Sequence, residues 1–80
     1  DPTGQLELLE RTLPDVWAGK KLDPLTDADR HRVVALTRSG AARIPAAGMV
    51  GQEGDVLHVI VRQDAVEALD RLLRLGEEAH

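Results

Sequence analysis

The sequence has 80 residues, a formal net charge of −4, no cysteine and a single aromatic residue, Trp17. A chain this short forms one domain with a thin core, and without cysteine it holds neither a disulfide nor a thiolate metal site. The acidic charge and the lack of stacking aromatics argue against a nucleic-acid partner. The sequence also contains no run of eighteen apolar residues that would span a membrane.

The N-terminal residues suggest a linker followed by one short element. Residues 1–4 have the composition of a turn or linker, the domain itself is expected over residues 5–76, and residues 77–80 are expected to form a tail. The leucines of Leu6–Leu13 fit helical spacing, so the segment is ambiguous from its residues alone. We assign it as a strand because of the family resemblance described below. Pro14 ends the element in either case.

The next segment combines a single tryptophan with a short turn. Trp17 is expected to anchor the core or an interface, with ligand stacking as the alternative. Residues 24–30 predict a short helical turn that begins near Pro24. Thr26 or Asp27 would cap that turn.

The middle of the sequence predicts a small sheet. Val33–Thr37 is a β-branched run typical of a strand, Ser39-Gly40 favours a tight hairpin, and residues 42–44 form a short partner strand that stops at Pro45. Val56–Val61 is apolar at nearly every position. Both of its faces should therefore be covered, one by the domain's own helix and the other by a partner subunit. These three runs together indicate a three-stranded meander.

The C-terminal part predicts an amphipathic helix, Asp64–Leu75. Asp64 and Glu67 have the spacing of a capping box, and Gly76 is a candidate C-cap. The apolar stripe of this helix contains Ala65, Val66, Leu69, Leu72 and Leu73. The predicted fold is thus α+β, with a small, mainly antiparallel sheet and the C-terminal helix packed on it.

No set of residues has the spacing of a catalytic or metal centre, and we expect the chain not to be an enzyme. His31, His58 and His80 lack the spacing of zinc ligands. His58 is either held by one hydrogen bond or a pH-sensitive residue at an interface. Two further clusters have no specific motif spacing. Asp23, Asp27 and Asp29 form either a solvated acidic face or a weak cation site, and Gly48, Gly51 and Gly54 indicate a flexible loop.

The order of four short motifs carries a family resemblance. They are Gly19-Lys20-Lys21-Leu22, a strand ending in Arg38, Ile44-Pro45, and Gly54-Asp55-Val56-Leu57, followed by the helix. Over residues 5–75 this order resembles the TrkA C-terminal (RCK_C) domain, and residues 1–4 look like the joint that precedes it in actinobacterial TrkA-type potassium-uptake proteins. The resemblance implies a cytoplasmic regulatory domain at the inner face of the membrane, held there by a membrane-embedded potassium transporter subunit. It also implies that NAD or ATP belongs to a separate N-terminal domain, with no cofactor in this one.

The resemblance further implies a homodimer and a nucleotide ligand, because domains of this family form two-fold dimers and some bind cyclic di-AMP in the dimer cleft. The positions of this chain that match the family's ligand contacts are Leu25, His31, Arg32, Val33, Ile44 and Pro45. Arg32 would contact a phosphate and His31 a base edge or a phosphate, while the four apolar residues would form walls for the adenines. The alternative for Arg32 is a solvated arginine at the start of a strand.

The chain departs from the family's ligand-binding pattern at one position. It has Leu25-Thr26 where cyclic di-AMP binders often carry Ile-Arg. The alternative function is a ligand-free dimerisation module of a cation/proton antiporter or another transporter.

Overall fold

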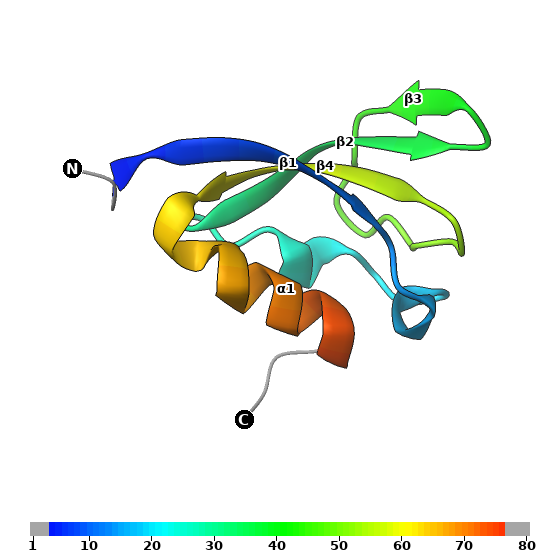
Figure 1. Cartoon of the computed structure of the whole chain (residues 1–80). Coiled ribbons are helices and arrows are strands. Elements are labelled where there is room, and N and C mark those ends of the chain that lie inside the picture. Colours follow the sequence, from blue (N-terminus) through cyan, green and yellow to red (C-terminus); the bar gives the residue numbers. More distant parts are fainter. Residues whose placement is uncertain (1–3, 77–80) are drawn as a thin grey trace.

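A computed structural model of the chain describes residues 4–76, so the expected tail and most of the expected linker lie outside the described residues. The fold consists of one four-stranded antiparallel sheet and one α-helix (Figure 1), which confirms the α+β prediction. The strands are β1 (Leu6–Thr12), β2 (His31–Arg38), β3 (Ala41–Arg43) and β4 (Val56–Arg62), and the helix is α1 (Val66–Leu75). Three 3₁₀ turns connect them: η2 (Asp15–Trp17), η3 (Asp23–Leu25) and η4 (Gln63–Ala65).

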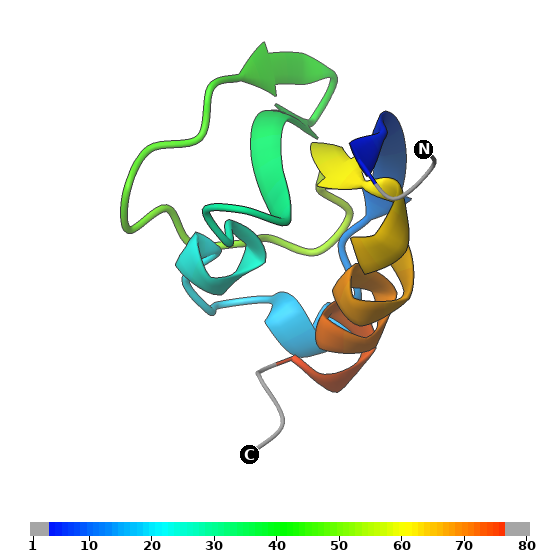
Figure 2. The same cartoon turned by 90° about the vertical axis from the view of Figure 1, so that its left-hand side faces the viewer.

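The strand order is β1-β4-β2-β3, so the prediction of a meander is wrong. A meander would pair β3 with β4, whereas β4 lies between β1 and β2. The reason is that β3 has only three residues, all exposed, and is followed closely by Pro45, which has no N–H for a further ladder. Residues 44–55 then return the chain to the other side of β2 (Figure 2).

The hairpin between β2 and β3 is confirmed. Arg38 pairs with Ala41, and the two loop residues, Ser39 and Gly40, have positive φ angles of 51° and 79°. Two successive positive φ values are the requirement of the turn whose twist matches that of the flanking strands.

One face of the sheet carries the core, and α1 with the three 3₁₀ turns lies against it (Figure 1). On β4, Leu57, Val59 and Val61 alternate toward this face and are fully buried. The core also contains Leu69, Leu72 and Leu73 of α1, as the apolar stripe of the helix predicts. The cover of the inner face by the domain's own helix is thus confirmed. The outer face of β4 is half-buried within one chain, and its cover by a partner subunit stays a prediction.

Trp17 is buried in this core, and its indole Nε1 donates a hydrogen bond to the carbonyl of Leu73 at 2.9 Å. The prediction of a packing anchor is confirmed. His58 lies on the outer face of the sheet, where its Nε2 is 3.4 Å from the Thr37 hydroxyl and its Nδ1 is 3.8 Å from a Glu10 carboxylate oxygen.

The C-terminal end of α1 agrees with the prediction from the sequence, and its N-terminal end does not. Gly76 ends the helix with a φ of 80°, and its N–H bonds to the carbonyl of Leu72 at 3.0 Å, as predicted. The capping box is wrong, because the helix begins after Ala65 without a side-chain cap. The 3₁₀ turn η4 places Asp64 one residue too early, and its carboxylate instead accepts a 2.7 Å bond from Arg62. No helix among residues 4–76 is long and apolar enough to cross a membrane.

Candidate functional site

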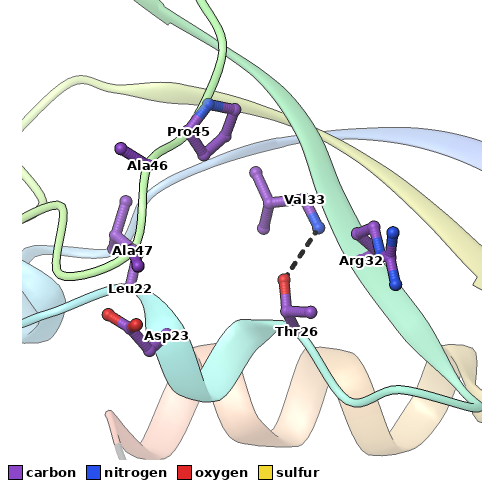
Figure 3. A pocket seen from close by; sticks show the side chains of 8 residues that line it. All are labelled: Leu22, Asp23, Thr26, Arg32, Val33, Pro45, Ala46 and Ala47. Atoms are coloured by element: carbon purple, nitrogen blue, oxygen red, sulfur yellow. Dashed lines mark hydrogen bonds between the residues drawn. The ribbon is translucent and has the colours of Figure 1, made fainter.

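A cavity of about 330 Å³ lies between η3, the start of β2 and the loop that follows β3 (Figure 3). The loop supplies one wall, the turn η3 and the residues beside it supply another, and β2 supplies the third. The lining residues are Leu22, Asp23, Thr26, Arg32, Val33, Pro45, Ala46 and Ala47. Arg32 and Asp23 are the two charged side chains in this set, and the rest of the lining is small or apolar apart from Thr26.

The turn η3 is fixed to β2 by a side chain that sequence analysis assigned differently. Thr26 follows the turn in an extended conformation, so it does not cap the turn's start as expected. Its hydroxyl instead accepts a bond from the Val33 N–H at 3.4 Å. This contact sits beside a β-bulge between Val33 and Ala35, and it fixes the position of Val33 in the wall of the cavity.

The opposite wall is held by Asp23 and by the loop glycines. Both carboxylate oxygens of Asp23 lie 3.1 Å from the Gly48 N–H, and the Leu22 N–H donates to the carbonyl of Met49 at 2.8 Å. Gly48 has a φ of 79°, which only glycine adopts at no steric cost. Gly51 serves packing instead, because a Cβ there would lie 2.7 Å from Cδ2 of Leu13.

The base of the loop is closed by a buried ion pair. Nε of Arg38 donates to Oδ1 of Asp55 at 2.9 Å, and Nη2 donates to Oδ2 at 2.7 Å. The bonds from Arg38, together with one from the Gln52 N–H, hold the pKa of the Asp55 carboxyl below its ordinary value although burial opposes this. The loop that carries Pro45 is therefore fixed at its start by β3 and at its end by this pair.

The structure brings together three of the six predicted site residues. Arg32, Val33 and Pro45 line the cavity. Ile44 precedes Pro45 but is 86% exposed and is not part of the lining. Leu25 is 0% exposed and belongs to the core rather than to a cavity wall.

The sixth residue, His31, is also turned inward. It is 6% exposed, and its Nδ1 donates to the carbonyl of Leu25 at 2.7 Å. One ring nitrogen of His31 is therefore already hydrogen-bonded to the backbone. His31 does not line this cavity but a different one. Its position follows from the alternation of β2, because His31 pairs with Val61 and shares the inner face of the sheet with it.

Sequence reasoning missed five lining residues, namely Leu22, Asp23, Thr26, Ala46 and Ala47. Two signals were available. Leu22 ends the Gly-Lys-Lys-Leu motif, and Ala46-Ala47 directly follow Pro45. The sequence analysis grouped Asp23 with Asp27 and Asp29, but its carboxylate binds the backbone of the loop at Gly48. Residues 4–76 contain no group of three side chains placed to hold a metal ion.

Chemically, the cavity combines a guanidinium, a carboxylate and apolar walls. A guanidinium matches phosphate or carboxylate oxygens through paired N–H donors, and Val33 and Pro45 offer apolar surface to a flat ring. The Asp23 carboxylate retains acceptor capacity beyond its bonds to Gly48. This arrangement suits a small organic anion that also carries a planar base.

Comparison with known proteins agrees with the motif order. No family model matches the sequence. The Trk system potassium uptake protein TrkA of Streptomyces coelicolor is 37% identical over 78 residues, which is 98% of this chain and 35% of that protein. The chain thus spans about a third of the length of this curated relative. Across nearly its whole length, the chain is a TrkA-type domain related to that of an actinobacterial protein.

Proposed function

We propose that the chain is a ligand-sensing regulatory domain in a potassium transport system. It acts on the cytoplasmic side of the membrane and is held there by a membrane-embedded potassium transporter subunit. Two observations support this proposal: the relative is named as a potassium uptake protein, and the domain carries a cavity with one guanidinium and apolar walls. The ligand-sensing part of this proposal rests on the cavity.

The ligand we propose is cyclic di-AMP, bound across a two-fold dimer axis. A volume of about 330 Å³ is at the low end for ligand pockets, which suits one nucleotide half of the ligand in each subunit. The ligand and an isologous dimer share two-fold symmetry, so each residue would meet the same chemical group twice. Arg32 would contact a phosphate, and Val33 and Pro45 would pack against an adenine.

Homodimer formation is part of the same proposal, and Ile44 supports it. This side chain is 86% exposed and directly precedes Pro45 in the cavity wall. A second copy that completes the ligand site would cover Ile44 and remove its apolar surface from water. The thin core of an 80-residue domain would gain further burial from this contact.

A ligand-free dimerisation module is the second candidate function, and Thr26 favours it. Thr26 stands where cyclic di-AMP binders of the family often have an arginine. Its side chain is neutral, and its hydroxyl accepts a hydrogen bond from the Val33 N–H. Arg32 is therefore the single cation in the cavity lining.

A thermal-shift screen separates these candidates. The domain is mixed with cyclic di-AMP, cyclic di-GMP, NAD(H), ATP, ADP or divalent cations, and a ligand that binds the folded state raises Tm by mass action. The proposal predicts a concentration-dependent rise with cyclic di-AMP. A Tm that no nucleotide changes would favour the ligand-free module.

A further inference from the structure

A second cavity, of about 340 Å³, lies where β2 begins and β4 ends. Its walls combine these strands with the start of β1 and the turn before β2. The lining residues are Leu6, Ala28, Asp29, Arg30, His31, Arg32, Val34, Ile60 and Arg62. Arg32 is the one residue that this set shares with the lining of the first cavity.

Three arginines meet at this cavity although the chain as a whole is acidic. The lining contains Arg30, Arg32 and Arg62 but only one carboxylate, Asp29, in a chain of net charge −4. The backbone fixes their proximity, because the Arg62 N–H donates to the carbonyl of Arg30 at 2.8 Å and Arg32 pairs with Ile60. Within the lining the cations outnumber the carboxylates, although Arg30 and Arg62 each also lie beside a carboxylate outside it, Asp27 and Asp64.

The donors of these arginines are incompletely used within residues 4–76. Arg62 bonds to Asp64 through Nη2 at 2.7 Å, but its buried Nε has no hydrogen-bond partner. Arg30 lies 3.7 Å from an Asp27 oxygen, beyond hydrogen-bond length. No carboxylate of the described chain lies within salt-bridge distance of Arg32. The cavity therefore offers an oxyanion the donors of Arg32 and the remaining donors of Arg30.

The remaining lining is apolar. Leu6 and Val34 are exposed, and Ile60 between them is half-buried. The pairing of Arg32 with Ile60 places a guanidinium directly beside this apolar surface. A ligand would therefore meet cationic donors and hydrocarbon side by side, because Arg62 likewise pairs with Leu6.

We infer that this cavity is a second anion site, which binds a phosphate group attached to an apolar body. The three guanidiniums provide forked donors for the phosphate oxygens, and Leu6, Val34 and Ile60 provide the surface for the apolar part. A soluble phosphorylated compound and a phospholipid headgroup share this chemistry. Since Arg32 lines both cavities, an occupant of the second competes with an occupant of the first for its guanidinium.

The test uses inorganic phosphate and phenyl phosphate, titrated into the ¹⁵N-labelled chain at constant ionic strength and followed by NMR. We expect saturable shifts confined to the amides of residues 28–34 and 60–62, with phenyl phosphate binding more tightly than inorganic phosphate. Arg30→Gln should weaken phenyl phosphate binding roughly ten-fold, because it removes a charge-assisted contact. Arg71→Ala, which removes an exposed arginine of α1, should leave it unchanged, and the spectra report whether each variant is folded.

A second arm identifies the source of the phosphate. The chain is sedimented with vesicles of phosphatidylglycerol in phosphatidylcholine, or of phosphatidylcholine alone. Retention on the acidic vesicles that Arg30→Gln abolishes assigns the site to a lipid headgroup, whereas phenyl phosphate binding without retention assigns it to a soluble compound. The inference is overturned if neither probe saturates, or if Arg30→Gln and Arg71→Ala bind both probes as the wild type does.

Discussion

The guanidinium of Arg38 holds the carboxylate of Asp55 through two hydrogen bonds, 2.7 and 2.9 Å long, with Asp55 only 1% exposed. The same guanidinium donates to the carbonyl of Val50 at 2.9 Å. One side chain of β2 therefore fixes two points of the loop that forms a wall of the first cavity. Because Asp55 is buried, loss of Arg38 would leave an uncompensated charge there and would cost more than the loss of one partner of an exposed ion pair.

This pair predicts a loss of stability in acid. The pKa of Asp55 is lowered in the folded state, chiefly by Arg38, so the carboxylate stabilises the fold at neutral pH. That contribution is lost as the pH falls below about 4, where the unfolded state takes up a proton first. Asp55→Asn should be less stable than the wild type near neutral pH and should lose less stability between about pH 5 and pH 2. Urea denaturation across this range checks the prediction, and parallel pH profiles would contradict it.

The start of α1 provides a second prediction. Asp64 bonds to Arg62 at the surface and caps no helix N–H. Asp64→Ala should therefore change the free energy of unfolding by less than about 0.5 kcal/mol, as expected for an exposed ion pair, whereas loss of a helix cap would cost about 1 kcal/mol. Chemical denaturation measures the difference, with Gln63→Ala as the exposed control. A loss of 1 kcal/mol or more, specific to Asp64, would show that the helix is capped after all.

Gly51 lies close to Leu22, which lines the first cavity. A Cβ at this position would lie 2.7 Å from Leu13 Cδ2, 2.9 Å from Leu22 Cδ2 and 3.1 Å from the carbonyl of Trp17. Gly51→Ala should lower the free energy of unfolding by about 1–3 kcal/mol through overpacking, and it should disturb the cavity through Leu22. Glu53→Ala, in the same loop but exposed, is the control. Equal stability of the two variants would mean that the leucines can move aside freely.

Several local elements could be predicted from the sequence, whereas the start of α1 and the arrangement of the strands could not. The β-branched run at Val33, the turn at Ser39-Gly40 and the Gly76 C-cap depend on neighbouring residues, and the structure has all three. The order of the strands depends on which distant segment pairs with β2, and no local pattern encodes that choice.

In the candidate site, too, some positions could be predicted from the sequence, and those that depend on distant contacts could not. Arg32, Val33 and Pro45 line the cavity as expected. Leu25 does not, because its burial depends on the tertiary packing of η3 against the core. The contact between Asp23 and Gly48 joins residues 25 positions apart, which a reading of the Asp23 neighbourhood alone does not reveal.

The proposed dimer makes a prediction for two exposed apolar residues on different parts of the molecule. Ile44→Asp should shift the molecule from dimer to monomer, because it places a charge where the second copy would pack. Leu75→Asp, at an exposed position of α1, should leave the dimer intact. Analytical ultracentrifugation checks this against a monomer mass of 8.7 kDa. A wild-type mass near that value, or dissociation caused by Leu75→Asp instead, would contradict the proposed interface.

Binding of cyclic di-AMP across the dimer axis is tested by calorimetric titration of this ligand into the wild-type chain, Arg32→Ala and Arg71→Ala. We expect saturable binding at one ligand per two chains. Arg32→Ala should bind about ten-fold or more weakly, since a hydrogen bond to a charged group is worth roughly 1.5–3 kcal/mol. Arg71→Ala should bind as the wild type does. The absence of binding to the wild type, or a stoichiometry of one ligand per chain with unchanged affinity in Arg32→Ala, would contradict the proposed site.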